Sequence, residues 1–508
     1  MKLLSRNRTT NLLLSRSISA EMRSYSSGHM AIITRSISLI LISTILITFM
    51  PSIGHGATSD KIIGNWKGTL KVAGVELRLV FKIKRGDDGK LVATLDSIDQ
   101  GAKDIAATGM KFEDPELVIS FMNLAGMYKG KISTDGKTII GTWTQAGNTH
   151  QLNLEKVEGE ITLGRRPQDP VKPYPYLEEE VAYSNEKAGI TLAGTLTMPK
   201  TGGPFTAALL ITGSGAQNRD EEIMNHRPFL VLSDYLTRQG LAVLRVDDRG
   251  VGGSTGSFAT ATSEDFSWDV QAGIEYLKTR KEINSERIGL IGHSEGGLIA
   301  PMVAARSDDV AFIILMAGPG ITGEEILYLQ SALIMKANGA SERMIELNRK
   351  LQTIMFDVVK QDLKQPEAGQ KLKKSIDDYI NGLNEADKAL VKSLNVQSQI
   401  QGILTPWFKF FLSYDPAPTL TKVKCPVLAI NGMLDLQVPW KENLGVIEIA
   451  LRKGKNKNFF VSRFKGLNHL FQTAETGALF EYSKIEETIS PEVLHFIGDW
   501  IARLYTSE

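Results

Sequence analysis

The stretch LIGHSEGGLIA, Leu290–Ala300, decides the fold of this chain of 508 residues. Its serine, Ser294, stands two positions after Gly292 and two positions before Gly296. The run before the serine has the pattern of a buried strand, and the run after it that of a helix. Together they form the Gly-x-Ser-x-Gly pattern of a nucleophile elbow, a turn too sharp for side chains at the glycine positions. The helix N-terminus would offer backbone N–H groups to a developing negative charge.

Strand-like and helical runs alternate from about residue 180 onward. Strands are expected at residues 191–199, 207–213, 241–247, 287–292, 310–318, 426–432 and 458–464. These runs are apolar at almost every position, which suits strands covered by helices on both faces. The alternation predicts the α/β class, with a doubly wound and mostly parallel sheet.

Residues 322–405 interrupt this alternation. They are rich in Glu, Lys, Leu and Met at helical spacing and contain few strand-like runs. The pattern predicts a helical insertion between two strands. Its position favours a lid over the site, and a packing embellishment is the alternative.

A serine nucleophile requires a general base. The histidines after residue 180 are His226, His293, His469 and His495. His469 follows the last expected strand, and a base in that loop can reach a serine at the carboxyl edge of the sheet. We interpret His293 as packing beside the serine and His495 as a face residue of the terminal helix. His226 either lines the site or is a solvated loop residue.

The base in turn requires an orienting carboxylate. Asp435, in AINGMLDLQVP, lies in the loop after an expected strand, and Asp415, in SYDPAP, is the alternative. The chain order Ser294, Asp435, His469 is an order known for serine hydrolases.

The loop in LLITGSGAQNRD supplies candidate oxyanion donors. We expect the backbone N–H groups of Ser214, with Gly215 as second choice, and of Glu295, the residue after the nucleophile. A flexible turn is the alternative. Asp247 and Arg249, in VDDRGVGGSTG, are expected to brace loops around the site. The glycines of that segment are not followed by Gly-Lys-Ser/Thr, so nucleotide binding is excluded.

Five ordered motifs, GSGAQNRD, DDRGVGGSTG, GHSEGG, NGMLDLQVP and GLNHLFQ, resemble those of the α/β-hydrolase superfamily. Within it, the chain resembles the bacterial secreted esterase and serine aminopeptidase-like (S33-like) group. The resemblance covers residues 180–505, without the helical insertion. One departure is Thr212, where many relatives have histidine before the oxyanion glycine.

The resemblance and the residues together predict a serine hydrolase. Ser294 would attack an ester carbonyl, His469 would act as base and then acid, and Asp435 would hold the imidazole. The expected substrate is a small carboxylic ester, and no metal or organic cofactor is needed. A small-peptide, amide or thioester hydrolase is the alternative enzyme. The alternative outside enzymes is an exported ligand-binding protein on an inert hydrolase fold.

The N-terminal region, residues 1–57, has the pattern of a signal peptide. A basic lead precedes the apolar run 37–50, which is shorter than the roughly 20 residues of a membrane span. We therefore expect export to the periplasm or the medium, with no stable membrane span after cleavage. An uncleaved N-terminal anchor is the alternative, and Met30 is an alternative start.

Two further segments precede the expected catalytic domain, residues 180–508. Residues 58–158 alternate apolar and polar positions between turn signals, which predicts a small antiparallel barrel or sandwich. Residues 159–179 are proline-rich and are expected to be a linker.

Composition restricts the remaining classes. The net charge of +1 gives no field that would favour nucleic acid, and no nucleic-acid partner is expected. The single cysteine excludes an intramolecular disulfide and Cys-rich metal sites.

Overall fold

The computed structural model describes residues 60–505, apart from 73–74, 87, 99–101, 125, 146–147, 160–164, 362, 395 and 397–399. The expected signal peptide lies outside the described residues. In the described part, no helix combines the length and the apolar character that crossing a bilayer requires.

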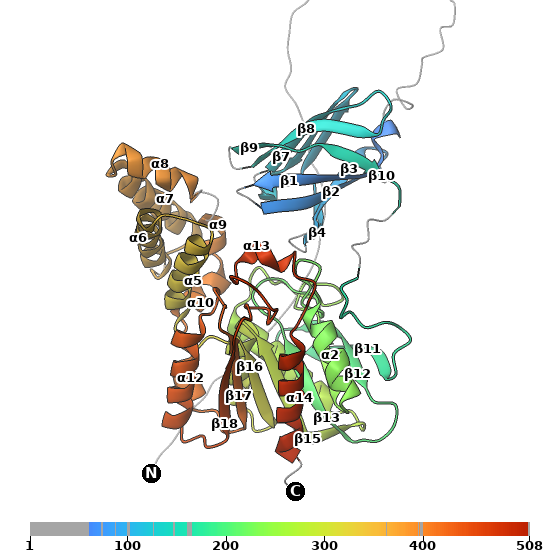
Figure 1. The fold of residues 1–508 in the computed structure, drawn as a ribbon, viewed down its shortest axis with the longest axis vertical. Coiled ribbons are helices and arrows are strands. Elements are labelled where there is room, and N and C mark those ends of the chain that lie inside the picture. The colour runs from blue at the N-terminus through green and yellow to red at the C-terminus, as the bar shows by residue number, and fades with distance from the viewer. Residues whose placement is uncertain are drawn as a thin grey trace, which may run out of the picture. The chain divides into compact units, whose positions relative to one another are not determined.

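The first sheet is a ten-stranded antiparallel half-barrel in the order β4-β3-β2-β1-β10-β8-β7-β6-β5, with β9 paired to β8 (Figure 1). Its strands are β1 Gly64–Val72, β2 Val75–Arg85, β3 Leu91–Ser97, β4 Ala102–Ala106, β5 Gly109–Glu113, β6 Glu116–Phe121, β7 Gly126–Ile132, β8 Thr138–Gln145, β9 Asn148–Gln151 and β10 Leu154–Val157. Strand β7 alternates buried and exposed residues along its whole length, as a one-sided sheet requires. The inner face carries an aromatic core that includes Trp66, Phe81 and Trp143.

The second sheet has eight strands in the order β11-β12-β14-β13-β15-β16-β17-β18. They are β11 Leu177–Asn185, β12 Ile190–Met198, β13 Phe205–Ile211, β14 Ala242–Val246, β15 Ile283–His293, β16 Phe312–Met316, β17 Val427–Gly432 and β18 Phe459–Phe464. The strands from β14 to β18 pair in parallel, and β12 and β11 add an antiparallel edge. The predicted doubly wound, mostly parallel sheet is confirmed.

Helices cover this sheet on both faces. Helices α3 Ser263–Lys278, α4 Glu295–Ala304 and α12 Trp440–Lys453 pack in one apolar cluster with the strands. Helices α2 Pro228–Arg238 and α14 Pro491–Tyr505 pack in a second cluster on the opposite face, the face toward the viewer in Figure 1. Burial on both faces explains why the strands are apolar at almost every position.

A helical insertion separates β16 from β17, as expected. It comprises α5 Gly323–Ala337, α6 Glu342–Val359, α7 Gln365–Asn381, α8 Glu385–Ser393, α9 Ile400–Ile403, α10 Pro406–Ser413 and α11 Ala417–Leu420. The helices therefore continue beyond residue 405, the end expected from the sequence. The insertion has its own apolar cluster, in which Leu351, Phe356 and Leu372 are buried.

The described part of the expected linker is attached to the catalytic fold. Arg166 donates hydrogen bonds to the carbonyl oxygens of Ile485 at 2.9 Å and Met224 at 3.0 Å. The Gln168 side chain donates to the Ile489 carbonyl at 2.7 Å and accepts from the Ile489 amide at 3.1 Å. Residues near 165–170 thus act as part of the catalytic unit rather than as a free tether.

Candidate active site

Ser294 lies on a strained turn between β15 and α4. Its backbone has φ 52° and ψ −116°, a left-handed conformation that a residue with a side chain adopts only under constraint. The Ser294 amide donates to the carbonyl of Met316 at 2.8 Å, and the Ser294 carbonyl accepts from Gly297 at 2.9 Å. These bonds tie the turn to the neighbouring strand and to its own helix. Ser294 is half-buried, whereas its neighbours His293 and Glu295 are buried.

The glycines of the motif are required by close backbone contacts. A Cβ on Gly292 would lie 2.0 Å from the carbonyl oxygen of Gly296. A Cβ on Gly296 would lie 2.1 Å from the carbonyl oxygen of Ile211. Backbone atoms cannot move aside as a flexible side chain can, so both positions accept only glycine without a shift of the sheet. This geometry is that of the nucleophile elbow predicted from the sequence.

Asp435 and His469 come from two different loops and meet at the carboxyl edge of the sheet. Asp435 follows β17, and its Oδ2 lies 2.8 Å from His469 Nδ1. Its Oδ1 accepts from the backbone N–H groups of Gln437 and Val438, each at 2.8 Å. The Asp435 side chain is 0% exposed. These contacts place the Nδ1 proton of His469 toward the carboxylate and leave Nε2 as the basic nitrogen.

The turn that carries His469 is held by a buried asparagine. Asn468 is 0% exposed, and its side-chain oxygen accepts from the amides of Leu470 and Gln472, each at 3.0 Å. An asparagine that bonds its own following backbone in this way fixes a turn without regular secondary structure. The orientation of the His469 ring is therefore set from both sides, by this turn and by Asp435.

His293, which directly precedes Ser294 in the sequence, contacts His469. The rings of His293 and His469 have centroids 4.8 Å apart, and His293 Nε2 lies 3.0 Å from the His469 carbonyl oxygen. Among the described residues, no hydrogen bond joins the Ser294 hydroxyl to His469. Bonds between a nucleophile and its base are often longer in unliganded sites and shorten when substrate is bound. The structure thus joins two of the three predicted triad side chains directly, and Ser294 as their partner stays a prediction.

The expected oxyanion loop passes beside the nucleophile. A Cβ on Gly213 would lie 3.3 Å from the Ser294 Cβ. The Gly213 amide donates to Glu221 Oε1 at 2.7 Å, so it is not free for a substrate. Within the described part of the chain, the amides of Ser214 and Glu295 donate to no acceptor. Both therefore stay the predicted oxyanion donors.

A small cavity adjoins this loop. Its lining includes Thr212, Gly213, Gly215, Asp248, Phe258, Phe266, Glu295 and Ile299. Gly215, the second-choice donor, has φ 103°, which favours glycine. Burial raises the pKa of Asp248 to about 8 and also raises the pKa of Glu295. The wall of the cavity thus combines apolar side chains with two carboxyl groups, those of Asp248 and Glu295, that hold their protons more strongly than usual.

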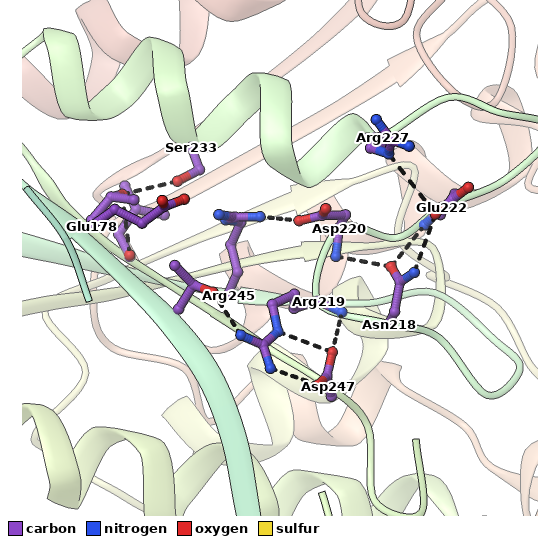
Figure 2. A network of polar contacts seen from close by, with 12 residues as sticks. Glu178, Asn218, Arg219, Asp220, Glu222, Arg227, Ser233, Arg245 and Asp247 are labelled. Atoms are coloured by element: carbon purple, nitrogen blue, oxygen red, sulfur yellow. Dashed lines mark hydrogen bonds and ion pairs between the residues drawn. The ribbon is translucent and has the colours of Figure 1, made fainter. Parts of the chain in front are cut away.

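Polar contacts brace the segment that follows the oxyanion loop, as Figure 2 shows. Asp247 accepts from the backbone and the guanidinium of Arg219, each at 2.8 Å, and from the Gly253 amide at 3.1 Å. Arg245 pairs with Asp220, and burial lowers the pKa of Arg245 to about 10. Asp247 therefore braces the loops around the site, as the sequence predicts.

Arg249, the second residue expected to brace loops, contacts helix α3. Its guanidinium donates to Asp269 at 2.7 and 2.8 Å. It therefore holds the loop after β14 against that helix.

Two of the alternative residues form no hydrogen bond with Asp435, His469 or Ser294 among the described residues. His226 is 0% exposed, with Nδ1 3.0 Å from the Thr488 hydroxyl and Nε2 2.9 Å from the Tyr482 carbonyl. Burial lowers the pKa of His226 to about 4. Its ring is neither solvated nor open to a substrate. Asp415 is exposed and accepts from the Ala417 amide at 2.9 Å, whereas Asp435 contacts the predicted base.

The sequence did not predict the side-chain contacts of two carboxylates near the nucleophile. Glu295 accepts from the Ser263 hydroxyl at 2.6 Å and from the Trp407 indole at 2.7 Å. Glu221 contacts His293 at 2.9 Å. The motif GHSEGG marks His293 and Glu295 as neighbours of the serine. Their partners, however, lie 72 and 112 residues away along the chain, and no local pattern identifies them.

No group of three or more His, Cys, Asp or Glu side chains is placed to hold a metal ion in the described ranges.

The sheet order, the elbow and the carboxylate–imidazole pair define a serine hydrolase of the α/β-hydrolase fold. Comparison with known families is more specific. The sequence profile of the X-Pro dipeptidyl-peptidase (S15) family matches residues 166–454, and the chain belongs to this family. The superfamily expected from the sequence is confirmed, while the matched family is S15 rather than the S33-like group.

Curated relatives share the hydrolase character. Esterase EstD of Thermotoga maritima is 24% identical over 337 residues, which span 66% of this chain and 70% of that protein. The putative hydrolase YtaP of Bacillus subtilis is 32% identical over 130 residues, 22% of this chain and 42% of that protein.

Solved structures with similarity include an esterase and a ferulic acid complex. Pyrococcus furiosus esterase Pf2001 gives a TM-score of 0.36 at 18% identity, over 65% of this chain and 93% of that one. Est1E of Butyrivibrio proteoclasticus, solved with ferulic acid, gives 0.37 at 19% identity, over 63% of this chain and 99% of that one.

Proposed function

We propose that this chain is an esterase that hydrolyses small carboxylic esters through an acyl-enzyme on Ser294. The observations that carry the proposal are the 2.8 Å contact between Asp435 and His469 and the strained turn on which Ser294 lies. The relative EstD, which aligns over two thirds of the chain, is named an esterase, and this favours an ester as substrate.

In acylation, the Ser294 hydroxyl oxygen attacks the ester carbonyl carbon, and His469 Nε2 takes the hydroxyl proton. The carbonyl oxygen becomes an oxyanion, which the amides of Ser214 and Glu295 would stabilise. Collapse of the tetrahedral intermediate breaks the bond to the alcohol, and His469 gives its proton to the leaving alkoxide. Asp435 holds the ring tautomer and stabilises the imidazolium that exists between these two transfers.

In deacylation, water replaces the alcohol. His469 takes a proton from the water as its oxygen attacks the acyl carbon, and the second intermediate expels Ser294. The carboxylic acid leaves, and the proton returns to the serine oxygen. The same oxyanion donors serve both steps, because the charge develops on the same oxygen.

A peptidase activity is the second candidate, and the S15 family match favours it. In that case the leaving group is an amine, and the substrate is a peptide with proline in the second position. A non-catalytic binding protein is the alternative outside enzymes.

A substrate panel separates these candidates. Wild type and Ser294→Ala are compared on p-nitrophenyl acetate and butyrate, on a thioester, and on an X-Pro p-nitroanilide. We expect ester turnover that falls by at least about 1,000-fold in Ser294→Ala. Faster turnover of the anilide would favour the peptidase, and no turnover of any substrate would favour the binding protein.

We also propose that residues 1–57 direct export. The support is the basic lead and the short apolar run of the sequence. N-terminal sequencing of the protein from a cell fractionation tests this. Recovery of a shortened chain outside the cytoplasm is expected, and an intact chain in the cytoplasm would contradict export.

A further inference from the structure

Glu221 and His293 form a buried pair that touches both halves of the active site. Glu221 Oε1 lies 2.9 Å from His293 Nδ1 and accepts from the Gly213 amide at 2.7 Å. His293 Nε2 lies 3.0 Å from the carbonyl oxygen of His469. One end of the pair therefore contacts the oxyanion loop, and the other end contacts the residue predicted to be the base.

The acceptors around His293 suit protons on both of its ring nitrogens. A backbone carbonyl oxygen only accepts, so Nε2 must donate to His469. Nδ1 faces an oxygen of Glu221 that already accepts from the Gly213 amide. Burial is the largest single influence and lowers the pKa of His293, but the Glu221 carboxylate, the His469 carbonyl and the Asp435 charge together raise this pKa above its usual value. The contacts are those of an imidazolium between a carboxylate and a carbonyl.

The backbone conformation and the burial of Glu221 both lower the stability of the folded chain. The φ of Glu221 is 51°, in the left-handed region, although this residue is not glycine. Its side chain is 4% exposed, and Glu221 Oε2 is buried without a hydrogen-bond partner in the described part of the chain. A strained and half-satisfied carboxylate lowers stability. Such a group is retained where its geometry serves the site.

We propose that Glu221 and His293 are positioning residues, an ion pair that bridges the oxyanion loop and the His469 loop across Ser294. This inference rests on the proposed function, because it concerns the same site. Glu221 sets the position of Gly213, and with it the adjoining donor Ser214. His293 sets the backbone of His469 while Asp435 orients its ring. The pair thereby keeps donor and base at a constant separation.

The first test is Glu221→Gln, which keeps the shape of the side chain. The amide oxygen can still accept from Gly213, but it carries no charge to hold a second proton on His293. A neutral His293 that donates from Nε2 has a lone pair on Nδ1, so the contact between Nδ1 and this oxygen becomes repulsive. We expect kcat per competent site to fall by roughly 10–100-fold, because small displacements of reacting groups have effects of this size. KM should change less than about twofold, because the bridge does not touch the ground-state substrate. Titration with a fluorophosphonate counts the competent sites.

The second test is His293→Asn, whose amide can reach Glu221 but is too short to reach the His469 carbonyl. We expect a similar fall in kcat. The double variant Glu221→Gln/His293→Asn should lose less than the product of the two single losses, because either substitution already breaks the bridge. Values of kcat within about twofold of wild type in both single variants would overturn the proposal.

Asn456→Ala is the matched control. Asn456 is a buried polar residue that donates to the carbonyls of Val423 at 3.1 Å and Cys425 at 2.9 Å, away from the triad loops. It should lower the temperature of unfolding and leave kcat per titrated site unchanged. If it lowers kcat as much as Glu221→Gln does, the effect is general destabilisation and the proposal fails.

If the variants do not fold, a measurement on the wild-type protein still tests the ion pair between Glu221 and His293. Nuclear magnetic resonance of ¹⁵N-labelled histidine should show both ring nitrogens of His293 protonated at pH 7. A lone pair on either nitrogen would contradict the ion pair. This measurement needs no substrate. If the wild type shows no turnover but both ring nitrogens carry protons, the proposed function fails and the ion pair stands.

Discussion

At the scale of single residues, the site concentrates conformational strain and buried charge at a few positions. Ser294 and Glu221 both have a positive φ without being glycine. Asp435 and Glu221 are both buried carboxylates, but Asp435 has three donors around it and Glu221 leaves one oxygen unpaired. Strain and incomplete bonding of this kind are typical of functional positions rather than of packing positions.

Replacing the orienting acid tests the role of Asp435. In Asp435→Asn the amide nitrogen would face His469 Nδ1 or displace the Gln437 and Val438 contacts, and the ring would favour the wrong tautomer. We expect kcat to fall by about 10³–10⁴-fold with little change in KM. Steady-state kinetics on an activated ester measures both values, and Asp415→Asn is the control. Equal loss in the two variants would contradict the assignment.

The pKa of about 8 for Asp248 makes a prediction about stability. An aspartate in the unfolded chain titrates near pH 4, so between about pH 4 and pH 8 the folded state holds the extra proton. The contribution of Asp248 to stability is therefore lost as pH rises through this window. The Asp248→Asn variant has no group to ionise at this position, so it does not lose stability in this window. Its amide can still accept from Gln217 and donate to Thr212.

Denaturant unfolding of both proteins at pH 5 and pH 8 measures the difference. Asp248→Asn should gain on the order of 1–3 kcal/mol relative to wild type between these two pH values. Parallel curves for the two proteins would show that Asp248 ionises normally in the folded state.

At the scale of elements, the catalytic fold was predictable because each part has a local signal. The strands carry unbroken apolar runs, and the elbow carries glycines that backbone contacts require. Edge strand β11 was missed, since its run LEEEVAYSN exposes its glutamates and lacks the apolar character of the central strands. The pairs Glu221–His293 and Glu295–Trp407 were also not predictable, because they join distant segments through single side chains.

The contact between Trp407 and Glu295 joins the helical insertion to the nucleophile helix. Trp407, the second residue of α10, stacks on Phe411 at 5.2 Å between ring centroids and donates to Glu295 at 2.7 Å. Glu295 is 2% exposed, so the loss of one donor leaves a buried carboxyl with Ser263 alone. This is the link through which an insertion that acts as a lid would be coupled to the site.

The Trp407→Phe variant tests this link. We expect a loss of about 1–3 kcal/mol in unfolding free energy, the cost of an unmet buried polar group. Amide hydrogen exchange in α10 should become faster, because the helix loses its attachment. Trp440→Phe is the control, since Trp440 contacts Arg463 rather than Glu295. Unchanged exchange in α10 would mean that the contact does not hold the insertion.

At the scale of the whole molecule, the two sheets have separate apolar cores. The core of the half-barrel consists of residues up to Leu154, and the two cores of the catalytic sheet begin at Val181 and Ala208. Separate cores are the mark of units that fold independently. Because Arg166 contacts the catalytic fold, we expect the boundary between the two units to fall before it.

Truncation tests this boundary. A chain that begins at Arg165 should unfold cooperatively and turn over a small activated ester within about twofold of wild type. A chain that begins at Leu177 loses the contacts of Arg166 and Gln168 and should unfold at a lower temperature. Thermal unfolding and ester kinetics measure both. An inactive or aggregated chain from Arg165 would show that the half-barrel is needed for the catalytic fold.

The central claim is that Ser294 is the nucleophile, and covalent labelling tests it most directly. The protein is treated with a fluorophosphonate, digested, and mapped by mass spectrometry. One adduct is expected, on the peptide that contains Ser294, with loss of ester turnover in proportion to labelling and no adduct in Ser294→Ala. An adduct at another residue, or ester turnover that persists in Ser294→Ala, would contradict the claim.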